Sequence, residues 1–176
     1  GGVLGPAALG VIGIYQDSNY TGSNSSSAQK VFNESANGAA TVAASTTYEM
    51  DAIYRIETTG STSHALSLGF AGTATLTSIG YEVSTPLTPP ATDIVAASYT
   101  RFTDTAAQTA VSNAVATATL HTVRLKGLVR VNAGGTFIPQ FKWSAAPGGT
   151  TTVKANSFLT LTPIGNDTVT TIGQWS

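Results

Sequence analysis

The segment YEMDAIYRIE, residues 48–57, alternates apolar and polar side chains at a period of two. Every second residue from Tyr48 to Ile56 is apolar, and the intervening positions are charged except at Ile53. A period of two with one apolar and one charged face is typical of a half-buried antiparallel strand. The segment therefore predicts a sheet with one face in a core and the other face towards solvent.

The residues that follow continue the β pattern. Residues 58–61 (TTGS) favour a turn, and a second run then has His64, Leu66, Leu68 and Phe70 on one face. Two such runs joined by a short turn predict a β-hairpin.

Further strands are predicted along the rest of the chain. The apolar positions change parity within residues 74–83, which predicts a β-bulge near Ser78. Residues 85–90 (TPLTPP) predict a long connection, because proline cannot donate to a central ladder. Residues 104–120 fit both helix and strand spacing, and their Thr and Val content favours a loop followed by a strand. The other predicted strands are residues 94–102, 123–131, 137–143, 151–155 and 158–164.

This rhythm of short strands and Gly or Pro turns is typical of an antiparallel β-sandwich or jelly roll. The composition agrees with it, since Thr, Ala, Gly and Ser together make up 89 of the 176 residues. Thr, Ser and Gly are weak helix formers, and no amphipathic helix separates successive strands as a parallel α/β fold requires. The length suits one domain with a core, and we expect that jelly-roll domain to span residues 31–176.

Residues 1–30 are predicted to lie outside the packed domain. Residues 1–14 form an uncharged apolar run that is too short, and too rich in Gly and Pro, for a membrane span. We expect this run to be an extended N-terminal arm that packs against a neighbouring chain. Residues 17–28 (DSNYTGSNSSSA) are polar without any period and predict a loop or linker.

The residue types of catalytic and metal sites are scarce. The chain has no cysteine, and neither His64 nor His121 stands in a recognisable triad or metal-ligand context. We therefore expect no catalytic residue, no metal and no cofactor. The carboxylate pair Glu49 and Asp51 is the strongest enzymatic pattern, because two residues on one side of a strand lie about 7 Å apart, within range of a glycosidase pair. A solvated strand face explains the pair more simply.

Charge is distributed unevenly along the chain. The formal net charge of −1 and the pI near 6.1 give no general attraction to nucleic acid or to an anionic membrane. Residues 1–104 carry three basic and eight acidic side chains, whereas residues 105–176 carry five basic and one acidic. The strand at 123–131 presents a basic outer face. Opposite charges favour packing between subunits of a closed ring, or pairing inside one folded monomer, and the sequence leaves both open.

Residues 31–83 and 123–165 carry a set of short motifs: TYE at 47–49, SH at 63–64, GTATLT at 72–77, KGL at 126–128, GTFIPQF at 135–141 and LTL at 159–161. The two segments cover more than half of the chain and resemble a domain of tailed-bacteriophage virion proteins. In such proteins the domain usually lies near the carboxyl end of tail-fibre or other surface-exposed chains. The resemblance implies a jelly roll similar to the trimeric tumour necrosis factor-like heads, and it carries over no active-site residue.

These observations predict a virion structural protein and not an enzyme. We expect a homotrimeric knob of a tail fibre or spike on the particle surface, with a role in host attachment. Its partners would be copies of itself, other virion proteins and a host-surface glycan or receptor, without nucleic acid or membrane insertion. Phe137, Phe141 and Trp143 are predicted to form the subunit interface, because aromatic residues at strand period usually lie in a core or an interface.

Loops on a rigid sandwich usually carry recognition, so the receptor-facing tips are predicted at residues 85–90 and 145–150. The candidate residues in these loops are Thr85, Pro86, Pro89, Pro90, Pro147 and Gly148. Two alternative functions stay open. One is a capsid decoration protein in which residues 1–14 clamp a neighbouring subunit or the shell, and the other is a glycan-cleaving or glycan-binding module.

Overall fold

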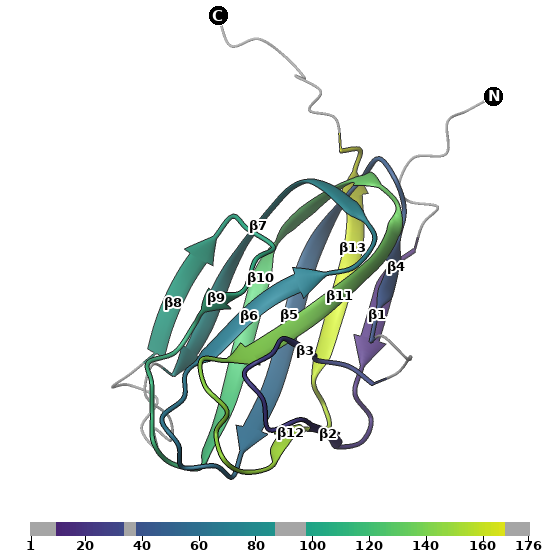
Figure 1. Cartoon of the computed structure of the whole chain (residues 1–176). Coiled ribbons are helices and arrows are strands. Elements are labelled where there is room, and N and C mark those ends of the chain that lie inside the picture. The colour runs from purple at the N-terminus through teal and green to yellow at the C-terminus, as the bar shows by residue number, and fades with distance from the viewer. Residues whose placement is uncertain (1–9, 34–37, 87–97, 168–176) are drawn as a thin grey trace, which may run out of the picture.

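The computed structural model describes residues 10–33, 38–86 and 98–167, which fold as a β-sandwich (Figure 1). These residues contain thirteen strands in two antiparallel sheets and no helix. The all-β antiparallel class expected from the sequence is therefore confirmed.

The larger sheet has eight strands and the smaller sheet has five. The main path of the larger sheet is β1 (Ile12–Tyr15), β13 (Phe158–Gly165), β5 (Thr46–Thr58), β10 (Thr119–Ala133), β7 (Thr75–Pro86) and β8 (Ser98–Thr103), with β12 (Thr151–Val153) beside β5 and β2 (Tyr20–Gly22) beside β12. The smaller sheet has the order β3 (Gln29–Lys30), β11 (Gly135–Trp143), β6 (Leu66–Ala71) and β9 (Thr109–Ala110), with β4 (Ala40–Val42) also paired to β11. In Figure 1 the strands β6 and β11 lie over β5 and β10.

The strands β5 and β10 form the centre of the larger sheet. They pair without interruption from Thr46 opposite Val131 to Thr58 opposite Thr119. The alternation that predicts the strand at residues 48–57 puts its apolar residues on the covered side, where none is more than 1% exposed. The long ladder keeps these side chains in register over the whole core, because successive residues of a strand point to opposite faces.

The core lies between the two sheets. The ring of Phe70 on β6 stacks on Phe137 of β11 with 4.7 Å between centroids, and it meets Tyr81 of β7 edge-on at 5.2 Å. Because Tyr81 belongs to the larger sheet and the other two rings to the smaller one, this cluster joins the layers. Burial of each large apolar side chain contributes about 1.5–3 kcal/mol.

The predicted hairpin of residues 48–57 with residues 64–70 is wrong. β5 pairs with β10, β13 and β12 in the larger sheet, whereas β6 pairs with β11 and β9 in the smaller one. The chain crosses between the layers in the segment between them, where the N–H of Thr62 donates to the carbonyl of Pro147 and His64 bridges to Val115. Both strands turn an apolar face to the same core. The pattern of alternating residues is the same for two strands that pair in one sheet and for two strands in opposite sheets, so it does not distinguish the two arrangements.

Residues 12–30, predicted as arm and linker, contribute three short strands to the sheets. β1 pairs with β13 from Ile12 opposite Leu161 to Tyr15 opposite Phe158, while β2 pairs with β12 and β3 with β11. These strands have two to four residues, so periodicity has no room to develop. Residues 1–9 of the predicted arm lie outside the described residues.

Several other predictions are confirmed. The bulge near Ser78 is present, since Arg130 lies opposite Ser78 while the next residue, Val131, lies opposite Leu76. Residues 104–120 contain the short strand β9 and the start of β10, separated by irregular segments. The strands predicted at 123–131, 137–143, 151–155 and 158–164 correspond to β10, β11, β12 and β13. The strand predicted at 94–102 corresponds to β8, and residues 87–97 are outside the described ranges.

Candidate functional site

The outer face of the larger sheet, here called the outer face, is the solvent-facing side of β1, β13, β5, β10 and β7. Residues directly opposite each other on antiparallel strands project to the same side, so the registers define rows across this face. One row runs from Tyr15 through Phe158 and Ile53 to Arg124, and Ser84 continues it on β7. The row begins with two aromatic rings and ends with donors and acceptors of hydrogen bonds.

The adjacent row is charged. It runs from Thr160 on β13 through Asp51 on β5 and Lys126 on β10 to Glu82 on β7. Acidic and basic side chains alternate along it, so neighbouring charges have opposite sign.

Exposed apolar side chains gather on the strands of the same sheet. Among the described residues, the large apolar side chains that are exposed are Val11, Tyr15, Leu128 and Ile164, at 46–63%. Tyr15, Leu128 and Ile164 belong to β1, β10 and β13, and Val11 immediately precedes β1. The registers place Tyr15 and Leu128 in different rows, so these side chains are separate apolar points on the sheet, as is common on protein surfaces.

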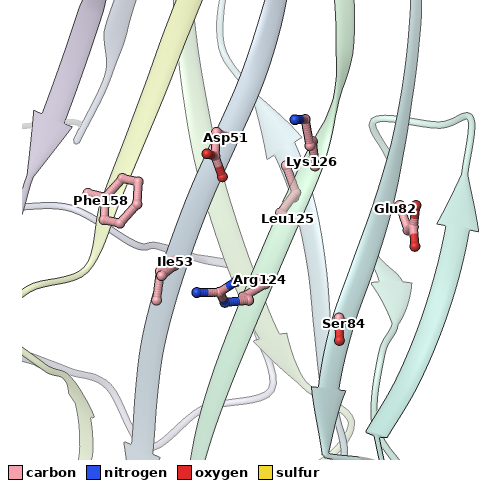
Figure 2. A pocket seen from close by; sticks show the side chains of 8 residues that line it. All are labelled: Asp51, Ile53, Glu82, Ser84, Arg124, Leu125, Lys126 and Phe158. Carbon is pink, nitrogen blue, oxygen red and sulfur yellow. The ribbon is translucent and has the colours of Figure 1, made fainter.

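A shallow hollow of about 440 Å³ lies in the middle of the outer face. We call it the sheet hollow, and Figure 2 shows the residues that line it: Asp51, Ile53, Glu82, Ser84, Arg124, Leu125, Lys126 and Phe158. In that view Phe158 lies at one end and Glu82 at the other, with Arg124 between them. The hollow thus crosses β13, β5, β10 and β7, and its rim combines one aromatic ring with groups of both charges.

The acidic and basic halves of the sequence meet inside one chain. β5 carries acidic side chains next to the basic side chains of β10, and Lys126 Nζ lies 3.3 Å from a carboxylate oxygen of Glu49. A second ion pair joins Lys154 Nζ to Glu57 at 2.5 Å. Of the two alternatives that the sequence leaves open, pairing within the monomer therefore accounts for at least part of the charge asymmetry.

The carboxylates of Glu49 and Asp51 lie on the outer face, as the strand spacing predicts. Glu49 is held by Lys126, whereas Asp51 lines the sheet hollow. Among the described residues, no group of three or more His, Asp or Glu side chains is placed to hold a metal ion.

Both histidines are in the core, beside one indole ring. The ring centroids of His64 and His121 lie 5.0 and 5.6 Å from that of Trp143. His64 Nδ1 is 2.6 Å from the carbonyl oxygen of Thr62, and since a carbonyl only accepts, Nδ1 carries the proton. Burial, with the neighbouring His64 as a second cause, lowers the pKa of His121 from 6.5 to about 3. His121 is therefore neutral at physiological pH and packs as part of the core.

The three residues predicted as a subunit interface lie inside the chain. Phe137, Phe141 and Trp143 are at most 1% exposed and belong to the core between the sheets. Trp143 also donates its indole N–H to the hydroxyl of Thr151 at 3.0 Å. Their surface is therefore already covered within one chain.

The residues of the predicted recognition loops differ in their exposure to solvent. Thr85 is buried and Pro86 is half-buried at the end of β7, while Pro89 and Pro90 lie outside the described residues. In the second loop Pro147 is buried and Gly148 is exposed. The N–H of Gly148 donates to the side chain of Asn24, so this tip is tied to the segment after β2.

No protein-family model, curated protein or solved structure matches this chain in comparisons of its sequence and fold. Among the described residues, no helix is long and apolar enough to cross a membrane. The candidate site therefore depends on the geometry of the outer face. The exposed positions of Arg124 and Lys126 are predicted by the basic face of residues 123–131. The positions of Tyr15 and Phe158 beside them depend on the pairing of β1, β13, β5 and β10, which the sequence pattern does not predict.

Proposed function

We propose that this chain is a structural protein of a phage particle, displayed on the surface as a homotrimeric knob that takes part in host attachment. The motifs of residues 31–83 and 123–165, which resemble a virion-protein domain, support the virion assignment. The observation that carries the attachment role is the outer face, where exposed apolar side chains and the sheet hollow lie on one rigid sheet.

A two-layer sandwich suits this role physically. Apolar rings from both layers interlock in the core, and the long ladder of β5 with β10 leaves the outer face with little backbone freedom. Closed assemblies also cover strand edges, which otherwise pair with other chains. A protein outside the cell benefits from the slow unfolding that such packing gives.

The oligomeric state is tested by light scattering on the purified full chain at several concentrations. A homotrimer gives a mass of about three times 17.9 kDa, independent of concentration in the micromolar range. A mass equal to one chain at every concentration overturns the trimer.

The place on the particle is tested separately with gold-labelled antibody on virions of the phage that encodes the chain. Label at the tail or fibre tips supports the attachment role. Label across the head supports the decoration alternative. Absence of label from intact particles overturns both roles.

A further inference from the structure

We propose that the sheet hollow binds a neutral oligosaccharide that lies across the strands, from the aromatic pair on β1 and β13 to the polar groups on β10 and β7. This inference rests on the proposed attachment function and names its ligand class. It places recognition on the sheet face, not at the loop tips.

The first step is the aromatic pair. Tyr15 and Phe158 are directly opposite each other on adjacent antiparallel strands, where side chains come within about 5 Å. Most of the described aromatic side chains are buried in the core, whereas Tyr15 is 56% exposed and Phe158 is half-buried at the end of the hollow. A sugar ring is amphipathic, with an apolar C–H face that packs on an aromatic ring and hydroxyls at its edge.

The second step is the polar part of the hollow. Asp51 and Glu82 offer carboxylate acceptors, Arg124 offers a planar fork of donors, and Ser84 offers a hydroxyl. Asp51, Glu82 and Arg124 form no ion pair with another described residue, in contrast to Lys126, which Glu49 holds. Their hydrogen-bonding capacity is available to a ligand, and charge-assisted hydrogen bonds are the stronger ones.

The third step is the charge pattern, which selects for a neutral ligand. The lining has two acidic and two basic side chains, alternating across the strands, so it presents no field of one sign. A hydroxyl both donates and accepts, and it can satisfy either kind of neighbour. A flat apolar partner would instead bury these charges without partners, at a high desolvation cost.

The size of the hollow also fits. Four strands at about 4.8 Å spacing give a length of about 14 Å, which accommodates a few linked sugar rings. The volume of about 440 Å³ lies in the range of small-molecule sites. Its open shape suits an internal segment of a longer glycan chain, because both ends can extend beyond the sheet.

The test uses the full chain on a printed array of neutral and anionic glycans, followed by titration of the best neutral glycan in ¹⁵N-resolved spectra. We expect binding to neutral glycans, with amide shifts on β13, β5, β10 and β7. The variants Tyr15→Ala and Arg124→Ala should each weaken binding by at least about tenfold, because the first removes an aromatic ring beside Phe158 and the second removes the donor fork in the middle of the hollow. Lys142→Ala, on the outer side of the smaller sheet, is the matched control and should bind as the parent does.

The proposal is overturned if no neutral glycan binds, if only anionic glycans bind, or if the amide shifts fall in the loop at residues 145–150. If the amides of the outer face shift with protein concentration and not with glycan, a second copy of the chain covers the face, and the glycan site is again excluded. The failures that concern glycan binding leave the trimer mass and the particle labelling unaffected, so the inference can fail while the proposed function stands.

Discussion

His64 and His121 lie against the same indole ring, that of Trp143, at the end of β11 in the buried core. Neither ring nitrogen of His121 has a hydrogen-bond partner among the described residues, and the same holds for Nε2 of His64. His121 is thus held in the core without a hydrogen-bond partner, in a form that is stable only while its ring is neutral.

The first prediction is that acid destabilises the fold through His121. Its pKa is about 3 when folded and 6.5 ordinarily, so below pH 6.5 the unfolded chain binds the extra proton and the folded chain does not. The free energy of unfolding should fall as pH drops from 6.5 towards 3, by about 1.4 kcal/mol per pH unit for one such group. Urea unfolding of the parent and of His121→Leu at a series of pH values measures this. Equal losses in both proteins would show that other groups are responsible.

The second prediction contrasts two tyrosines on the covered side of β5. The hydroxyl of Tyr48 accepts a hydrogen bond from the N–H of Ala43 at 2.9 Å, whereas the hydroxyl of Tyr54 has no partner among the described residues. Tyr48→Phe leaves a backbone donor unpaired and should cost about 1–3 kcal/mol, while Tyr54→Phe should be neutral or stabilising. Chemical denaturation of both variants gives the comparison. A larger loss for Tyr54→Phe would contradict the assigned hydrogen bond.

The third prediction concerns the bond between Trp143 and Thr151. The hydroxyl of Thr151 accepts the indole N–H at 3.0 Å, and both residues are fully buried. Thr151→Val keeps the shape but leaves the indole donor unpaired, which should cost about 1–3 kcal/mol and change the tryptophan emission. Thr152→Val, at the next and less buried position, is the control and should change stability little. Equal effects of the two variants would argue against this bond.

The fourth prediction tests a turn glycine. Gly72 has a φ of +127°, and a side chain there would collide with the carbonyl of Thr136. Gly72→Ala should therefore lower the free energy of unfolding by more than about 1 kcal/mol, since this positive φ is unfavourable for alanine. Gly13 on β1 has open space around its Cα, so Gly13→Ala is the matched control. Thermal unfolding of both variants measures the difference in stability. A melting temperature of Gly72→Ala equal to that of the parent would contradict the backbone conformation assigned to Gly72.

The sequence pattern predicted which face of a strand is buried better than it predicted which strands pair with each other. The alternation at residues 48–57 correctly assigned the buried side of β5, whereas the aromatic residues of β11, predicted as a subunit interface, lie in the core of one chain. Neither pattern says what covers a face, so β5 was paired with β6 instead of β10. Short edge strands such as β2 were missed because their hydrogen bonds need only the backbone. The same limit applies to the outer face, where Tyr15 and Phe158 become neighbours only through the pairing of β1 with β13.

The last prediction separates the core from the subunit contacts. Phe141 is fully buried in one chain and meets the ring of Trp143 edge-on at 6.1 Å. Phe141→Leu should lower the free energy of unfolding by about 1–3 kcal/mol through lost packing, because no other chain is needed to cover the ring. At temperatures where the variant is folded, its mass in light scattering should equal that of the parent. A folded variant with a smaller mass would restore Phe141 to the subunit interface and would mean that the core rearranges on assembly.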